Sequence, residues 1–455
     1  MDAPSNSVPK TQKDRVLSAR HLLNNEDKWL KKGVWVYFLL LIFEGALRKW
    51  FLPELATPLL IIRDPLALWL LLVAWKNGRL TTNAYIAGMI LIGILGTFTA
   101  IIFGHGNLSI AIYGARILLL HFPLFFVIGK IFSREDVIKM GKVVVFISIP
   151  MAILVIVQFY SPQSAWVNRG IGGDMEGAGF GGALGFYRAP ATFSFTNGTH
   201  NFFGFAACFI FYFWLNHENI NRLILIASTV CLILVIPFSI SRSLMFHVIV
   251  SLTFAILALL KRPKYLAQLL LAISTCIFSL SFLSNSDFLQ TAIQAFTYRF
   301  EDASSQEGGL EGTLGDRFLG GLISALFESS EQPFFGYGLG IGSNVANKML
   351  SGGRGFLLAE EEWARLIGEL GPLLGLGFII LRLRLIGNIG YQCYKKLQQE
   401  DVLPWMLLSY GCLMVAQGQT AQPTSLGFCT LIGGLMIASL HTPQDPSKNL
   451  CSNRT

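Results

Sequence analysis

The sequence feature that most constrains the fold is a succession of apolar runs, each about as long as a helix that crosses a membrane. A helix needs about 20 mostly apolar residues to span the hydrocarbon core of a bilayer. The apolar runs, with short charged connectors between them, cover residues 34–51, 58–75, 83–103, 108–129, 143–161, 199–216, 223–240, 244–260, 266–285, 367–386, 403–420 and 422–441. Because backbone polar groups in lipid must be paired internally, these runs predict an all-α polytopic membrane protein with about twelve transmembrane helices.

The overall composition is typical of a membrane protein and unlike that of a soluble one. The chain of 455 residues is 53% hydrophobic and only 14% charged, whereas about a quarter of the residues of a soluble domain are charged. The first 33 residues are polar and basic, so we expect the first apolar run to stay as an anchor and not to be removed as a signal peptide. The net charge of +8 has to be interpreted by location, and it does not indicate a nucleic-acid partner.

The distribution of lysine and arginine predicts how the chain is oriented. Roughly two thirds of the 35 basic residues lie in the terminal tails and in alternate connectors, which by the positive-inside rule places both termini in the cytoplasm. The predicted organisation is a basic tail (1–33), five spans (34–161), a first extracytoplasmic loop (162–198), four spans (199–285), a large, partly helical extracytoplasmic loop (286–366), three spans (367–441) and a cytoplasmic tail (442–455).

The basic residues outside these inner segments are mostly arginines. Many of them fall in the predicted outer loops, of which the larger is long enough to be functional or disordered. The planar guanidinium group of arginine suits two-pronged binding of phosphate or carboxylate. An anionic ligand reached from the membrane is therefore predicted, with these arginines as candidates: Arg48, Arg63, Arg116, Arg169, Arg188, Arg242, Arg299, Arg317, Arg354 and Arg365.

Three charged residues at the end of the large loop have helical spacing. Glu361, Arg365 and Glu369 are four residues apart, so a helix would place them on one face, where neighbouring pairs support it. For Glu361 and Glu362 the alternative is a solvated helix end. Glu369 begins an apolar run, and a carboxylate at that depth is costly and by default functional. We expect it to be important, for example by orienting Arg365 or a loop backbone.

Two more arginines stand near predicted helix starts. Arg242 occupies a turn between two apolar runs, and Arg188 precedes Pro190 and a threonine-rich segment that leads into a helix. Such a start offers unpaired backbone N–H groups to an anion. The alternatives are that Arg242 extends its head to lipid headgroups and that Arg188 pairs with Asp174 or Glu176.

Charged residues near the N-terminus predict a structural cluster. Two pairs lie at or within apolar spans, where a charge needs a partner: Glu44 with Arg48, and Arg63 with Asp64. We expect ion pairs between the first two helices, joined by Arg116 and His121. Contact with a ligand is the alternative.

Several functional motifs are absent from the sequence. There is no Asp-x-Asp pattern to hold a metal on a nucleotide sugar, no P-loop and no dinucleotide-binding fingerprint. His200 and His247 are isolated in the sequence, so we expect packing or hydrogen bonding from them and not metal binding. An enzymatic site is therefore predicted to work without nucleotide, metal or cofactor.

Four short motifs, in order, resemble one family of proteins. They are RAPATFSFTN from Arg188, Ser-Arg-Ser around Arg242, PFFGYGLGIGS from Pro333, and Glu-Leu-Gly from Glu369 with Gly375 after it. This order is similar to that of the O-antigen ligase and Wzy-type polysaccharide polymerase superfamily of bacterial membrane glycosyltransferases. The resemblance covers about residues 140–440, with Ala191 and Thr196 in place of the family's glycine and proline.

The resemblance implies a glycosyl transfer from a polyprenyl diphosphate carrier at the outer face of the bacterial cytoplasmic (inner) membrane, in the periplasm or at the exterior. Arg188 and Arg242, with Arg317 as a weaker third, would neutralise the diphosphate, and Glu360 or Glu361 would accept a proton from the acceptor hydroxyl. The expected partners are the polyprenyl-diphosphate-linked oligosaccharide, a glycan acceptor and membrane lipids, and a flippase or chain-length regulator would act with them.

One departure from the family favours polymerisation over ligation. The ligases carry a His-Asn pair where this chain has Glu360 and Glu361, and their histidine is regarded as catalytic or acceptor-positioning. Two alternatives stay open beside the polymerase: ligase-type transfer to another acceptor, and a transporter or flippase of the lipid-linked glycan. A membrane assembly or sensor protein with an outer ligand-binding domain is a third.

Overall fold

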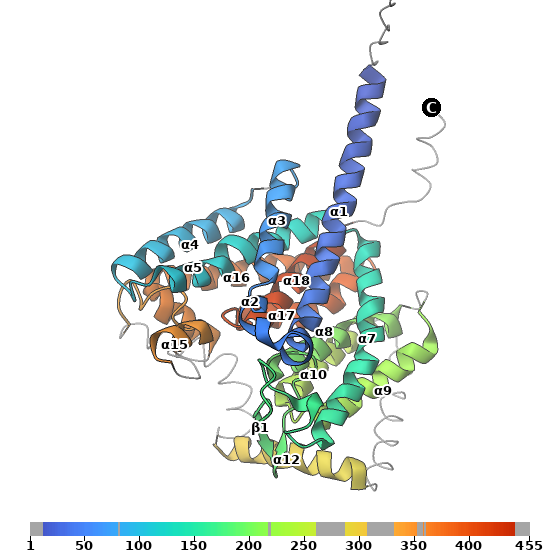
Figure 1. Ribbon diagram of the computed structural model, residues 1–455. Coiled ribbons are helices and arrows are strands. Elements are labelled where there is room, and N and C mark those ends of the chain that lie inside the picture. The colour runs from blue at the N-terminus through green and yellow to red at the C-terminus, as the bar shows by residue number, and fades with distance from the viewer. Residues whose placement is uncertain are drawn as a thin grey trace, which may run out of the picture.

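The computed structural model describes residues 12–80, 82–216, 220–260, 287–306, 332–352, 358 and 361–441, and this part of the chain is mostly helical (Figure 1). Six helical segments within it are long and apolar enough to cross a membrane: Pro53–Lys76, Ala84–Ile102, Leu108–Ile131, Arg134–Tyr160, Arg242–Leu259 and Glu362–Gln398. Three shorter helices are also apolar: Arg222–Phe238, Leu403–Gln417 and Pro423–Ser439. These features are those of a helical membrane protein. The predicted span at 266–285 lies outside the described residues.

The elements follow one another along the chain with few strands. The N-terminal half contains α1 (Gln12–Ala46), η1 (Leu47–Phe51), η2 (Pro53–Leu55), α2 (Ala56–Leu59), α3 (Arg63–Lys76), α4 (Ala84–Ile102), α5 (Leu108–Arg116), η3 (Ile117–His121), α6 (Phe122–Ile131) and α7 (Arg134–Tyr160). The rest contains η4 (Trp166–Asn168), β1 (Gly181–Ala183), β2 (Phe186–Tyr187), α8 (Thr196–Leu215), α9 (Arg222–Phe238), α10 (Arg242–Leu259), α12 (Asp287–Gln306), α15 (Asn344–Leu350), α16 (Glu362–Gln398), α17 (Leu403–Gln417) and α18 (Pro423–Ser439).

Short polar side chains set many of the helix starts. Asn83 accepts a hydrogen bond from the first turn of α4, and Ser241 does the same for α10. Ser133 and Asp136 form a reciprocal capping box at the start of α7. These caps pair N–H groups that have no partner within the helix, so the helix begins at a defined residue even where both flanks are apolar.

Helices α8 and α18 form the centre of the molecule. Most residues of both helices are buried. Helix α8 packs against α7, α9, α10, α17 and α18, while α18 packs most extensively against α6 and α17. A helix that is apolar all round has to be surrounded by other elements, which is the position that the phenylalanine-rich sequence of α8 requires.

Helix α7 connects two different ends of the molecule. At its start, Arg134 donates to Asp401 (2.6 Å), and Asp136 pairs with Lys31 of α1. At its other end, the hydroxyl group of Tyr160 donates to a main-chain carbonyl of α12. At about 1.5 Å per residue, the 27 residues of α7 separate these ends by about 40 Å. The segments that meet at the first end are those whose charge predicts a cytoplasmic location.

Helix α12 lies across the end of the molecule that is opposite to the start of α1 (Figure 1). Leu289, Ala292 and Ala295 form its buried side, and it contacts α9 and the hairpin strand β1. Helices α12 and α15 both belong to the large loop predicted at 286–366. Residues 307–331 of this loop lie outside the described part of the chain.

Helix α16 is broken at Gly371, where φ is 75° and ψ is 170°. Non-glycine residues rarely adopt this conformation, and Pro372 suits the first position of the second segment because it needs no N–H donor there. A Cβ atom added at Gly375 would lie 2.8 Å from the Cα atom of Ile367, so the segment before the break packs against the one after it. The predicted span at 367–386 therefore contains a change of direction that its apolar pattern does not reveal.

The glycine-rich segment at 333–343 packs its backbone against this break. The N–H group of Tyr337 donates to the carbonyl of Gly368 (2.7 Å), and that of Gly338 donates to the carbonyl of Glu369 (3.0 Å). A Cβ atom at Gly336 would lie 2.5 Å from the same Glu369 carbonyl oxygen. Glycines in the motifs at 333–343 and 369–375 thus permit one backbone contact between segments that are distant in the sequence.

Candidate functional site

A cavity of about 850 Å³ lies between several helices. Its walls come from the start of α8, the start of α10, the second half of α12, the start of α16 and the connection between α17 and α18. This volume is within the range of small-molecule sites. The walls are basic at one corner, apolar along α10, and rich in side-chain amides between α8 and α18.

The basic corner of the cavity consists of Arg188, Arg242 and Arg299. Arg188 donates its Nε to the carbonyl of Gly181 (3.0 Å), and Arg299 of α12 donates its Nη1 to the next carbonyl, that of Gly182 (2.9 Å). The β1–β2 hairpin therefore holds two of the three guanidinium groups. The structure places Arg188 and Arg242 in one cavity with Arg299, which the sequence offered only as one of several candidate arginines of the large loop.

Three helices begin at the cavity without a side-chain cap. Phe195, Glu361 and Gln422 immediately precede α8, α16 and α18, and all three residues line the cavity. The first turn of a helix has N–H groups without intrahelical partners and carries a partial positive charge. Together with the basic corner, these helix starts make the cavity suitable for an anion.

The basic corner continues into an apolar stripe along α10. Met245, Phe246 and Ile249 line the cavity three, four and seven residues after Arg242, so they share its helix face. Ile249 is 49% exposed, and α10 is apolar enough to cross a membrane. The cavity thus joins its arginine residues to an exposed apolar stripe on α10.

The loop that follows Arg188 is held by a clamp at Ala191. This residue has φ of 51°, in the left-handed region that favours glycine. The side-chain amide of Gln158 in α7 accepts from the N–H group of Ala191 (2.8 Å) and donates to its carbonyl (3.2 Å), while Lys49 donates to the same carbonyl (2.6 Å). A glycine would adopt this backbone conformation without strain.

Removing the clamp should destabilise the protein in a way that glycine partly reverses. Gln158→Leu leaves the buried N–H group of Ala191 unpaired, which should lower the free energy of unfolding by about 1–3 kcal/mol. Adding Ala191→Gly to that variant should restore about 1 kcal/mol, because glycine adopts this conformation without strain. Thermal unfolding of the purified variants measures both effects. A double variant less stable than Gln158→Leu alone would contradict the strain at Ala191.

The buried carboxylate at the start of α16 belongs to Glu362 and not to Glu361. Glu362 accepts from Arg365 (3.0 Å) and from Arg382 (2.6 Å), whereas Glu361 is exposed and extended just before the helix. Of the predicted group, Arg365 and Glu369 pair with each other, whereas Glu361 is exposed, as the alternative of a solvated helix end expects. The helix begins only at Glu362, and Arg365 turns back to the residue three before it.

Glu369 is fully buried and has two partners. One carboxylate oxygen pairs with Arg365 (2.7 Å), and the other accepts from the N–H group of Gly342 (2.9 Å). Glu369 thus orients both an arginine and a loop backbone. Neither Arg365 nor Glu369 lines the cavity itself.

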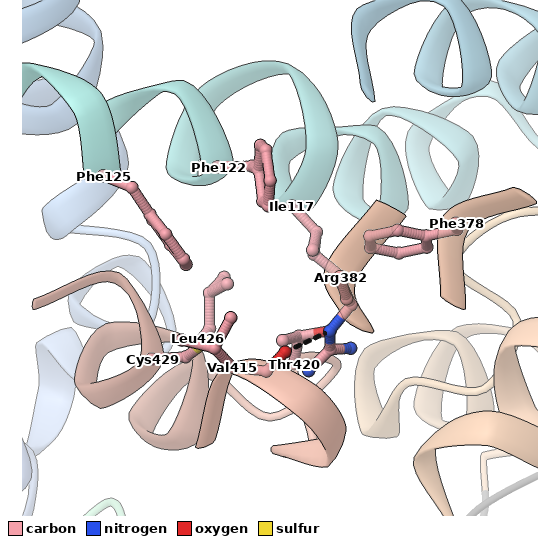
Figure 2. A pocket seen from close by; sticks show the side chains of 9 residues that line it. All are labelled: Ile117, Phe122, Phe125, Phe378, Arg382, Val415, Thr420, Leu426 and Cys429. Atoms are coloured by element: carbon pink, nitrogen blue, oxygen red, sulfur yellow. Dashed lines mark hydrogen bonds between the residues drawn. The ribbon is translucent and has the colours of Figure 1, made fainter. Parts of the chain in front are cut away.

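Arg382 is a buried residue that the sequence interpretation missed. It falls near the end of the predicted span at 367–386, its side chain is buried, and its Nε donates to the carbonyl of Val415 (2.7 Å; Figure 2). Beside it is a cavity of about 10 Å³, room for about one water molecule, lined by Ile117, Phe122, Phe125, Phe378, Arg382, Val415, Thr420, Leu426 and Cys429 (Figure 2). The signal that could have found Arg382 is a charge that interrupts an apolar run.

The N-terminal charges form the predicted ion-pair cluster, which is confirmed. The pairs are Glu44 with Arg48 (3.4 Å), Glu44 with Arg63 (3.2 Å), Asp64 with Arg116 (2.8 Å) and Asp64 with His121 (2.9 Å). The cluster also reaches the site, because Arg63 donates to the carbonyl of Pro423 at the start of α18 (2.6 Å). Arg48 donates to the hydroxyl group of Ser194 in the loop after Arg188 (2.9 Å).

Some predicted site residues lie elsewhere or have unexpected neighbours. Glu360 and Arg317 fall outside the described residues. His200 and His247 were expected to be isolated, but both line the cavity, and their rings stack with centres 6.0 Å apart because α8 packs against α10. Among the residues that the structure describes, no three His, Cys, Asp or Glu side chains are grouped so that they could hold a metal ion.

The interpretation of the cavity rests on its geometry, because no protein-family model and no curated protein matches the chain. Chemically, the cavity offers cationic groups and helix starts for an anion, apolar surface for a hydrocarbon chain, the carboxylate of Glu361 for proton transfer, and amides for neutral polar groups.

Proposed function

We propose that this chain is a membrane glycosyltransferase that takes a polyprenyl-diphosphate-linked oligosaccharide and polymerises or transfers its glycan. The observation that carries the proposal is the meeting of Arg188, Arg242 and Arg299 with uncapped helix starts in one cavity. A diphosphate needs such cationic partners in a site of low polarity. An isoprenoid chain attached to that diphosphate could follow the apolar stripe from Arg242 to Ile249 along α10.

The reaction needs one base and one set of groups that stabilise the leaving group. The acceptor hydroxyl attacks the anomeric carbon, and its proton passes to the carboxylate of Glu361. The bond between the anomeric carbon and the diphosphate oxygen breaks, and Arg188 and Arg242 stabilise the charge that develops on the departing diphosphate. Attack from the opposite side inverts the anomeric configuration. Glu360 and Arg317 keep the roles that the resemblance assigns to them, as a second candidate base and a third cation.

The proposed location is the outer face of the bacterial cytoplasmic membrane. The cavity lies near α12 and the β1–β2 hairpin, which stand at the far end of α7 from Arg134 and Asp401. The charged segment at 130–142 and the residues around Asp401 belong to that Arg134 end and fit a cytoplasmic position. A polyprenyl-linked substrate in the outer leaflet would then meet the cavity at its own level.

Glu361→Gln should remove the base and lower turnover by about 10²–10⁴-fold. A carboxylate base works only when it is deprotonated, so the unmodified protein should lose activity toward acidic pH and the variant should lose that limb of its pH profile. Polymer formation in membranes, measured across pH, tests this. Glu54→Gln is a matched control, since Glu54 is exposed and does not line the cavity. An unchanged pH profile in Glu361→Gln would remove Glu361 from the mechanism.

Transport of the same lipid-linked glycan is the second candidate, and one observation favours it. Broken membrane helices are common at transporter sites, and α16 is broken at Gly371 beside the cavity wall. Product analysis with purified protein and lipid-linked oligosaccharide separates the candidates. Longer glycans indicate a polymerase, glycan on a new acceptor indicates a ligase, and movement of intact substrate between leaflets indicates a transporter.

A further inference from the structure

We propose that the cavity contains a separate subsite for the hydroxyl groups of a carbohydrate. This subsite is the amide wall, formed by Asn197, Asn201, Gln417, Gln419 and Gln422. The inference rests on the proposed function, because it assigns the glycan part of the same ligand. A carboxamide offers both donors and acceptors, which matches sugar hydroxyl groups that also donate and accept.

Hydrogen bonds between side chains link the amide wall from α8 to α18. Asn197 donates to the side-chain oxygen of Gln422 and to the hydroxyl group of Ser425 (3.3 Å). Asn201 donates to the same hydroxyl group (3.1 Å), and Gln422 donates to the side-chain oxygen of Gln419 (2.8 Å). The four amides thus act as a linked array with a fixed spacing.

One acceptor in this array has no protein partner. The side-chain oxygen of Asn197 is shielded from solvent and accepts no hydrogen bond within the part of the chain that the structure describes. A buried polar atom of this kind is costly unless a partner is supplied. Asn197 lies in the cavity wall, so a rotation of its side-chain amide would turn this oxygen toward the cavity, where a ligand hydroxyl group would supply the partner.

Buried charges hold the loop that carries the glutamines. The Nη2 of Arg382 donates to the carbonyl of Gly418 (3.1 Å), and Glu362 accepts from the N–H group of Thr420 (3.1 Å). Arg63 donates to the carbonyl of Pro423 (2.6 Å). These three bonds fix the backbone between α17 and α18, whereas the side chains of Gln417, Gln419 and Gln422 line the cavity. A polar wall fixed in this way is organised before a ligand binds, which reduces the entropic cost of binding.

The amide wall and the basic corner suit chemically different parts of a glycosylated ligand. The basic corner contains guanidinium groups suited to a diphosphate, while the amide wall is uncharged. A neutral sugar attached to the diphosphate would lie against amides without displacing a counter-ion. The subsite is therefore expected to add affinity for a glycosylated carrier and none for the bare lipid diphosphate.

The test compares two soluble probes on the purified full chain in detergent. They are farnesyl diphosphate and farnesyl diphosphate that carries N-acetylglucosamine. The unmodified protein should bind the sugar-bearing probe about tenfold more tightly, and Gln422→Leu should reduce that advantage by about fivefold, since one net hydrogen bond is worth roughly this factor. The affinity for bare farnesyl diphosphate should stay within about twofold. Isothermal titration measures all of these constants.

Two further variants keep the outcome clear. Gln419→Leu, at a partly exposed position of the same wall, serves if Gln422→Leu does not fold. Gln392→Leu is the matched control, because Gln392 is an exposed glutamine of α16 that bonds Asn388 and does not line the cavity. Arg242→Ala should weaken both probes by the same factor.

The outcomes distinguish the subsite from the proposed function. Equal affinity of the unmodified protein for both probes, or equal weakening of both by Gln422→Leu, would overturn the carbohydrate subsite. Farnesyl diphosphate that binds the unmodified protein and Arg242→Ala equally well would overturn the diphosphate role and leave the subsite to be judged by the sugar-dependent difference alone. If neither probe binds the unmodified protein, both the diphosphate role and the carbohydrate subsite are overturned.

Discussion

Replacing Glu362 with leucine is expected to lower the free energy of unfolding by about 3–5 kcal/mol, because it removes one partner from a buried charge network. The carboxylate of Glu362 pairs with Arg365 (3.0 Å) and Arg382 (2.6 Å) and accepts from the N–H group of Thr420 (3.1 Å). Without this carboxylate, Arg365 is still paired with Glu369. Arg382 then loses the ion pair with Glu362 and keeps its hydrogen bonds to main-chain carbonyl groups. Thermal unfolding of the purified protein in detergent measures the loss.

Two comparisons separate the charge effect from a general effect of substitution. Glu361→Leu, one residue earlier, changes an exposed side chain and should alter stability only slightly. The double variant Glu362→Leu/Arg382→Leu removes both an acid and a base, so it should be more stable than Glu362→Leu alone, since an uncompensated buried charge costs more than a missing pair. Equal stability of Glu362→Leu and Glu361→Leu would contradict the network described for α16.

Arg242→Ala is expected to lower the rate of glycan transfer by about a hundredfold, which corresponds to a loss of about 3 kcal/mol in transition-state stabilisation. Arg242 opens α10 at the basic corner, where the diphosphate charge is proposed to develop. Arg242→Lys should retain part of the activity, because it keeps the charge but loses the planar pair of donors. Polymer length and initial rate in membranes that contain each variant measure the effect.

The matched control is Arg222→Ala. Arg222 is the first residue of α9, just as Arg242 is the first residue of α10, but it is exposed and does not line the cavity. We expect the activity of Arg222→Ala to stay within about twofold of the unmodified protein, since a surface change away from the site has little effect on the fold. Normal long polymer from Arg242→Ala would exclude Arg242 from the site.

The class of the fold could be predicted from the sequence because its causes are local. The length of an apolar run and the charges beside it determine whether a helix can lie in a membrane, and neither depends on which other helices it meets. The ion pairs of Glu44 and Asp64 were predictable for a similar reason, since a charge within an apolar span needs a partner. Arg188 and Arg242 could be singled out because both stand near helix starts.

The details of the site depend on contacts between segments that are far apart in the sequence. The phase of α16, which buries Glu362 and exposes Glu361, depends on the residue where the helix begins. The contact between Glu362 and Arg382 requires the break at Gly371, because 20 residues of straight helix would separate them by about 30 Å. Spacing rules for a continuous helix therefore give the wrong partner for Arg365.

The sequence by itself determined that this chain is helical, that it suits a membrane, and which arginines stand at the ends of helices. Only the tertiary structure decided that Arg299 joins Arg188 at the β1 strand and that Arg63 and Arg382 hold the loop of the amide wall. The physical reason is that apolar burial follows local composition, whereas hydrogen bonds and ion pairs act over about 3 Å and exist only where packing brings their two groups together.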